Sequence, residues 1–186
     1  MIQPGDILCV DGSGWLSAGI IAAEYGTVAP ARPVSHVGIF VAGDPYPIVI
    51  EALWRVKTNT LPVSLAGTQK AWVLHDDSIT PAQRNIIVGE ALSFSAKDYG
   101  YLDLIAQGFD AIAHVDWATH YLSTFLDEFP VCSFVVAKAY AQINLDFGVS
   151  SADIKPSDIM TFAETHPLIY SIAEITAASC AVSYPI

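Results

Sequence analysis

The stretch PVCSFVVAKAY, residues 130–140, decides how the rest of the sequence is interpreted. Cys132 stands two residues after a proline, and the run that follows contains neither glycine nor proline. This pattern predicts a helix that begins at or next to Cys132. The unpaired N–H groups and the positive dipole end of a helix N-terminus favour an anion. A thiolate is such an anion, so Cys132 is a candidate nucleophile, and the first N–H groups could hold an oxyanion. The alternative is a small apolar residue in a buried helix.

The composition indicates a single domain, residues 1–186, with a substantial core. Hydrophobic residues make up 53% of the chain, which argues against disorder. The formal net charge is −11, from 19 Asp and Glu against 8 Lys and Arg. Such a chain is repelled by phosphate backbones and anionic lipids, so no nucleic-acid partner is expected. The apolar segment 167–186 contains polar residues, including Glu174, and predicts core packing or a subunit contact rather than a stable membrane span.

The cysteines and the N-terminus bear on the compartment. Cys9, Cys132 and Cys180 are too few and odd in number for a disulfide framework, and no CxxC pair suggests zinc. The start, MIQPGDILCVDG, does not have the pattern of a signal peptide. A cytoplasmic location is the default expectation, and delivery by a phage or by cell contact stays open.

Four residues of the middle segment could suggest a metal site, namely Asp110, His114, Asp116 and His120. Asp110 and His114 would share a helix face, but no third ligand has convincing spacing. No cofactor and no metal are therefore expected.

Hydrophobic patterns predict an α+β chain. Strands are expected at residues 6–10, 35–42, 47–53 and 72–75. Helices are expected at residues 15–25, from Thr80-Pro81 to about 95, in parts of 98–129, from Cys132 to near Gly148, and shortly after Pro156.

His36 is the candidate base for a cysteine nucleophile. It lies in the predicted strand SHVGIFV, where His36, Gly38 and Phe40 share one face. A four-residue hairpin loop would place Glu51 directly opposite His36, and a register shift of two would leave them diagonal on the same face. Gly38 would leave room above the strand for a helix end. The alternative is that His36 is an ordinary strand histidine and Glu51 a solvated edge residue.

Other candidate side chains are weaker. His75 ends a predicted strand before a surface turn at Asp76-Asp77, and His166 precedes a proline in a predicted loop. Three tyrosines could contact a substrate or an oxyanion, although tyrosine is more often simply packed. They are Tyr25, Tyr99 and Tyr101.

Together these motifs resemble a known family. GDIL near the start, SHVGIFV, IEA and a Cys-Ser pair at a helix start resemble the circularly permuted papain-like hydrolases. The most similar group is the YiiX/YebB-like branch of the NlpC-type cysteine peptidase superfamily, with lecithin:retinol acyltransferase-like enzymes more distant. In that branch the His strand and the polar residue precede the Cys helix, and the order here is His36, Glu51, Cys132. The likeness extends from Pro4-Gly5-Asp6 to Lys155-Pro156-Ser157-Asp158.

The resemblance implies a papain-like fold with a small antiparallel sheet packed against helices. It also implies that Cys132 is the nucleophile, His36 the base and Glu51 the orienting group. The expected activity is hydrolysis of an amide or ester bond through an acyl-enzyme. Substrates would be a peptide or isopeptide, a cell-wall peptide or a lipid ester. The alternatives are an acyltransferase or lipid hydrolase on the same fold, and a binding module without turnover. Oligomeric state is not indicated.

Overall fold

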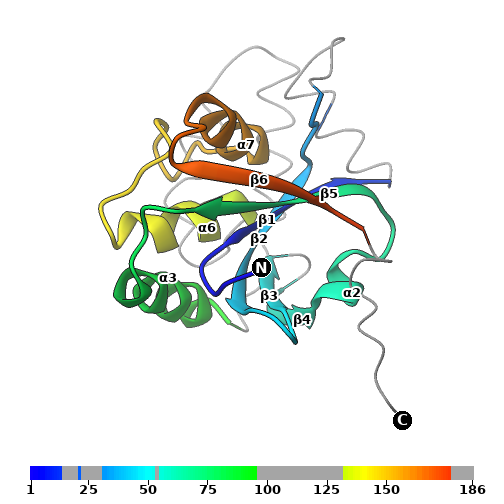
Figure 1. Cartoon of the computed structure of the whole chain (residues 1–186), viewed down its shortest axis with the longest axis horizontal. Helices are drawn as coiled ribbons and strands as arrows, with labels where there is room; N and C mark the ends of the chain where they lie inside the picture. Colours follow the sequence, from blue (N-terminus) through cyan, green and yellow to red (C-terminus); the bar gives the residue numbers. More distant parts are fainter. Residues whose placement is uncertain (14–20, 22–30, 53–54, 96–131, 177–186) are drawn as a thin grey trace.

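The computed structural model describes residues 1–13, 21, 31–52, 55–95 and 132–176. Within these residues it contains an antiparallel sheet and four helices, an α+β architecture (Figure 1). The strands are β1 (Ile7–Gly12), β2 (His36–Ala42), β3 (Ile48–Ala52), β4 (Val56–Thr60), β5 (Thr68–Asp76) and β6 (Tyr170–Ile175). The helices are α2 (Leu61–Ser64), α3 (Pro81–Ser93), α6 (Cys132–Ala141) and α7 (Pro156–Thr165).

The sheet has the order β4-β3-β2-β1-β5-β6, and all neighbouring strands are antiparallel. Figure 1 shows α3, α6 and α7 gathered toward one side of the sheet and α2 on the other side, next to β4. One large core cluster joins the three longer helices to one face, through residues such as Val37, Ile39 and Ile50. A smaller cluster covers the opposite face with Phe40, Val49 and two leucines of the α2 region.

Several sequence predictions are confirmed locally. The strands expected at 6–10, 35–42 and 47–53 correspond to β1, β2 and β3. Thr80 caps α3 through a capping box with Gln83, and Pro81 takes the first helical position. The helix expected after Pro156 is α7. The expected strand at 72–75 is present but longer, because β5 runs from Thr68 to Asp76.

Three elements were not predicted, and one helix end was wrong. β4 lies in the polar stretch VKTNT, and α2 is a four-residue helix, LPVS. β6 lies in the segment expected to form core packing or a subunit contact. The Cys132 helix ends at Ala141 rather than near Gly148, since Asn144 adopts a positive φ of 60°. Of the predicted helix 15–25 the structure describes residue 21, which is helical. The helices predicted within 98–129 and Cys180 lie outside the described residues.

Candidate active site

The structure brings the three predicted site residues together. His36 is the first residue of β2, Glu51 lies in β3, and Cys132 is the first residue of α6. His36 Nε2 lies 3.0 Å from Glu51 Oε2, and a hydrogen bond joins His36 to the Cys132 side chain. The Glu51 side chain is 2% exposed and that of His36 is 16% exposed. Glu51 is therefore not the solvated edge residue that the sequence left open.

The register between β2 and β3 differs from the directly opposite pairing expected from a four-residue hairpin loop. Glu51 pairs with Gly38, and the register shifts between Phe40 and Ala42. His36 and Glu51 are thus diagonal, two residues apart in register, and still share a face of the sheet. A shift of two preserves the pair because side chains alternate with a period of two.

Gly38 is required by β3 rather than by the helix. A Cβ built at Gly38 would lie 2.9 Å from the Ile50 carbonyl oxygen and 2.7 Å from Val49 Cγ1. It would also lie 3.3 Å from Glu51 Cβ. The expectation that this glycine makes room for a helix end is therefore wrong. Its absent side chain allows the Glu51 side chain to lean across toward His36.

Helix α6 does not pack over the face that His36 and Glu51 share. Cys132 and the buried residues of α6 belong to the core cluster on the opposite face, with Val37 and Ile39. The thiol reaches His36 because both are the first residues of their elements. The helix is fixed by Tyr140, whose hydroxyl donates to the Gly5 carbonyl over 2.7 Å, and by Ser133, whose hydroxyl donates to the Ile154 carbonyl over 2.6 Å.

The electrostatics of His36 favour its protonated form. Burial alone would lower its pKa, but the charge and hydrogen bond of Cys132 and those of Glu51 outweigh burial. Together they raise the pKa of His36 to about 10. Because Nε2 is engaged by Glu51, Nδ1 is the ring nitrogen left for the thiol. The arrangement therefore favours an imidazolium at His36, between the Glu51 carboxylate and the Cys132 side chain.

Glu51 is held by two further donors that the sequence did not reveal. Asn59 Nδ2 donates to Glu51 Oε1 over 2.6 Å, and the Ser64 hydroxyl donates to the same oxygen over 2.7 Å. Burial alone would raise the pKa of Glu51. The hydrogen bond and charge of His36, together with the hydrogen bonds of Asn59 and Ser64, outweigh burial and lower this pKa. No local motif marked Asn59 or Ser64, because their position depends on the pairing of β4 with β3 and on the α2 turn.

Cys9 provides an internal contrast to Cys132. It lies within β1, is fully buried, and faces the same core cluster. Burial raises the pKa of the Cys9 thiol, and the nearby Cys132 adds to that increase. Cys9 thus has the environment of an inert core thiol.

The two other histidines that the structure describes, His75 and His166, have different partners. His75 is in β5 and contacts Asp6 at 2.8 Å, while Asp76 is fully buried rather than in a surface turn. His166 follows α7 and stacks on Phe162 with ring centroids 4.1 Å apart. The residues at 110–120 that were considered as metal ligands, and the three candidate tyrosines, fall outside the described residues.

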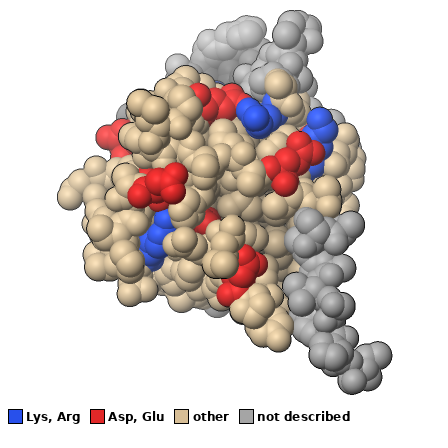
Figure 2. Space-filling model, viewed as in Figure 1, with Lys and Arg blue, Asp and Glu red and all other residues tan. Residues whose placement is uncertain are grey.

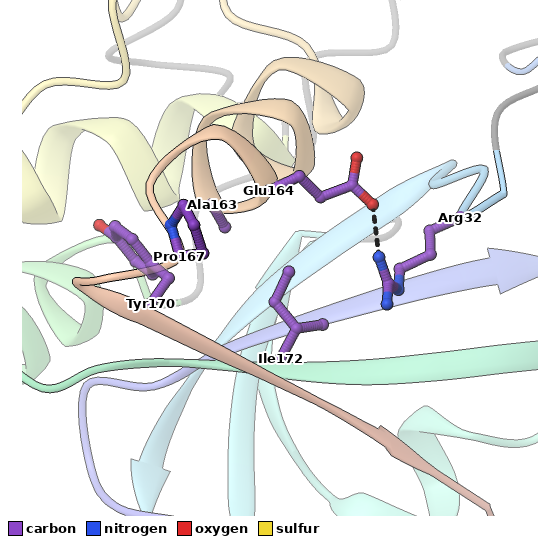
Figure 3. Close-up of a pocket in the computed structure, with 6 residues that line it drawn as sticks. All are labelled: Arg32, Ala163, Glu164, Pro167, Tyr170 and Ile172. Atoms are coloured by element: carbon purple, nitrogen blue, oxygen red, sulfur yellow. Dashed lines mark hydrogen bonds and ion pairs between the residues drawn. The ribbon is translucent and has the colours of Figure 1, made fainter.

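One face of the described surface and one of its pockets can be compared with the candidate site. Figure 2 shows acidic side chains spread over one face with few basic ones between them. A pocket of about 310 Å³ lies between α7, β6 and Arg32, with the Arg32–Glu164 ion pair at 2.7 Å across it (Figure 3). None of the three candidate residues lines this pocket. Over the described parts of the chain, every helix is too short or too polar to cross a bilayer.

Comparison with known proteins identifies a similar fold. No protein-family model matches the chain, and neither does any curated protein. The crystal structure of the metalloprotein YiiX from Escherichia coli O157:H7 matches with a TM-score of 0.58 and 22% sequence identity. The match covers 79% of this chain and 69% of that one. The chain therefore has a fold similar to that of YiiX.

Proposed function

We propose that this chain is a cysteine hydrolase that cleaves an amide or ester bond through Cys132, His36 and Glu51. One observation carries the proposal. A histidine bound to a buried carboxylate through Nε2 also contacts a cysteine at the first residue of a helix. Nucleophile, base and orienting group are the three parts that covalent catalysis by a thiol requires.

The reaction follows from the roles of the three side chains. His36 takes the proton of Cys132, and the thiolate attacks the substrate carbonyl carbon. Backbone N–H groups at the start of α6 stabilise the resulting oxyanion. The imidazolium then protonates the leaving amine or alcohol, which leaves an acyl group on Cys132. Water attacks the thioester with His36 as base, the acid departs, and the free thiol is restored.

The proposed fold family is the circularly permuted, papain-like NlpC type. The order His36, Glu51, Cys132 along the chain supports it, as does the similarity to YiiX. An antiparallel sheet with a cysteine-bearing helix packed on it is the expected architecture of that type.

YiiX is described as a metalloprotein, which raises the question of whether a metal fits this chain. Among the described residues, no three His, Cys, Asp or Glu side chains are grouped as metal ligands. Both oxygens of Glu51 accept hydrogen bonds from protein donors, which a metal would have to displace. These side chains do not fit a metal site, and the proposed reaction uses Cys132, His36 and Glu51 without a metal.

The proposed substrate is a peptide, an isopeptide, a cell-wall peptide or a lipid ester. An acyltransferase in which an alcohol or amine replaces water is the second candidate, because the same acyl-enzyme would serve both reactions. A binding module that has lost turnover is the third.

An activated ester tests the proposal without knowledge of the substrate. The full chain is mixed with p-nitrophenyl acetate, and nitrophenolate release and the mass of the Cys132 peptide are followed. We expect an acetyl group on Cys132 and continued turnover, both lost in Cys132→Ala and kept in Cys9→Ala. Acetylation without turnover would favour the binding module, and transfer of acetyl to an added alcohol would favour the acyltransferase. Acetylation elsewhere at the wild-type rate would contradict the nucleophile.

A further inference from the structure

The two oxygens of the Glu51 carboxylate have different partners. Oε2 faces the imidazole of His36, whereas Oε1 accepts two hydrogen bonds, from Asn59 at 2.6 Å and from Ser64 at 2.7 Å. Asn59 lies on the edge strand β4, and Ser64 is the last residue of α2. The two donors come from consecutive elements that the triad itself does not include.

A buried carboxylate depends on such donors. Glu51 is 2% exposed, so an oxygen without a partner here would be cut off from water at a high free-energy cost. Two neutral donors on Oε1 meet that need without bringing a second positive charge that would compete with His36. They also fix the rotation of the carboxylate, because Oε1 cannot turn toward the imidazole while both hydrogen bonds hold.

We infer that Asn59 and Ser64 are positioning residues that hold Glu51 in the orientation and charge state in which it supports the His36 imidazolium. The inference rests on the proposed function, since it concerns the same three side chains. It adds Asn59 of β4 and Ser64 of α2, but not their neighbours, to the residues that support the active site. Neither residue touches the thiol or the substrate in this role, because each acts through Glu51.

The chain provides matched variants for a test. Asn59→Leu keeps the approximate volume and removes the donor, and Ser64→Ala removes the hydroxyl. Ser64→Thr retains a hydroxyl and serves as the conservative rescue. Thr58→Val is the control, because Thr58 is exposed on the same strand and pairs with Ile50 on the opposite face from Glu51.

The measured quantity is the titration midpoint of His36, followed by NMR of the imidazole ring in the full-length chain. The His36 signal is assigned by its loss in His36→Gln. In the wild type we expect the midpoint near the pKa of about 10 that its surroundings produce. Each single variant should lower it, the double variant Asn59→Leu/Ser64→Ala should lower it further, toward that of Glu51→Gln, and Ser64→Thr and Thr58→Val should keep it. A residue that only stabilises the fold would lower the melting temperature without moving the midpoint.

The outcomes separate this inference from the proposed function. A wild-type midpoint near the ordinary histidine value of about 6.5 would show that Glu51 does not stabilise the His36 imidazolium, and it would overturn the positioning role. The proposed function is decided separately, by acetylation of Cys132 in the same wild-type chain. A raised wild-type midpoint that stays unchanged or rises in the double variant would overturn the positioning role alone and leave the three-residue mechanism in place. A midpoint that falls equally in Thr58→Val would also overturn the positioning role, because the effect would then belong to β4 in general.

Discussion

Two histidines of this chain are paired with buried carboxylates, and only one of them has the surroundings of a catalytic base. His36 lies 3.0 Å from Glu51, and His75 lies 2.8 Å from Asp6. The Asp6 carboxylate is also bound by Arg84 at 2.7 Å, so its charge is already balanced. Glu51 instead has neutral donors as its other partners.

The two histidines also differ in the second partner of the imidazole ring. His36 also forms a hydrogen bond with the Cys132 side chain, whereas His75 Nε2 lies 3.4 Å from Asp77, whose side chain is 67% exposed. A histidine–carboxylate hydrogen bond therefore does not by itself indicate catalysis. His36 differs from His75 in two ways. It contacts a cysteine, and its carboxylate partner has neutral donors rather than an arginine as further partners.

The first test concerns the thiol, since it is the feature that His75 lacks. Substoichiometric iodoacetamide near neutral pH should label Cys132 on the order of 100-fold faster than Cys9, because burial raises the pKa of Cys9. Peptide mapping by mass spectrometry measures both sites in one sample. Faster labelling of Cys9 or Cys180 would contradict the assignment of Cys132 as the nucleophile. Cys9→Ala is the matched control and should leave labelling of Cys132 unchanged.

Replacement of each histidine tests whether the two histidine–carboxylate pairs differ in function. His36→Ala should lower turnover of an activated ester by about 100-fold to 10,000-fold, the usual contribution of a general base. His75→Ala should leave turnover per folded molecule unchanged and reduce the free energy of unfolding by about 1–3 kcal/mol, because buried Asp6 loses a partner. Steady-state rates and urea unfolding measure the two quantities. Equal rate losses in both variants would show that the two pairs are not functionally different.

Removal of each carboxylate charge should separate activity from stability. Glu51→Gln should lower turnover, by less than His36→Ala, because the base remains but loses its orientation. Loss of the negative charge disfavours the imidazolium, so the pKa of His36 should fall below about 10. The step that needs the imidazolium should then fail at a lower pH than in the wild type. A pH–rate profile whose alkaline limb stays in place would remove Glu51 from the mechanism.

The matched change is Asp6→Asn. It should leave the rate profile in place and reduce the free energy of unfolding by about 3–5 kcal/mol, because Arg84 loses its buried partner. Chemical denaturation measures the loss, with circular dichroism to confirm that the variant folds. If the variant does not fold, Asp6→Glu gives a milder version of the same comparison.

The smallest expected effect concerns two glycines. Gly38→Ala should reduce the free energy of unfolding by about 1–3 kcal/mol, since the new Cβ meets the Ile50 carbonyl oxygen and the strand must move. The same movement should weaken the His36–Glu51 hydrogen bond and lower turnover. A Cβ added to Gly89 in α3 would meet no atom within 4 Å, so Gly89→Ala should stabilise by about 0.5–1 kcal/mol. A stabilising Gly38→Ala would contradict the packing described for the pair.

The sequence allowed prediction of the parts of the site that local rules determine. Strand parity placed His36 and Glu51 on one face, and helix signals placed Cys132 at a helix start. The exact pairing could not be predicted, because the shift between Phe40 and Ala42 depends on distant residues. The Ile2 backbone, for example, donates to Asp44 in the hairpin over 2.8 Å.

The hydrogen-bond partner of Glu51 on the edge strand β4 could not be predicted from the sequence for a similar reason. The β4 sequence VKTNT has no alternation of apolar residues and forms a strand only by pairing with β3. Asn59 therefore had no signal as a partner of Glu51. The face on which α6 packs was likewise a tertiary property, which sequence parity alone could not give.

The position of β6 in the sheet has a consequence for biosynthesis. Five strands come from the first 76 residues, whereas the sixth, Tyr170–Ile175, comes from much later in the chain and pairs with β5. While the chain emerges from the ribosome, β5 presents open backbone groups beside the core residues Trp72 and Leu74 until Tyr170–Ile175 is made. A ribosome-stalled or truncated chain that ends before residue 170 should thus be prone to aggregate, and chaperone demand should be highest during this interval of translation.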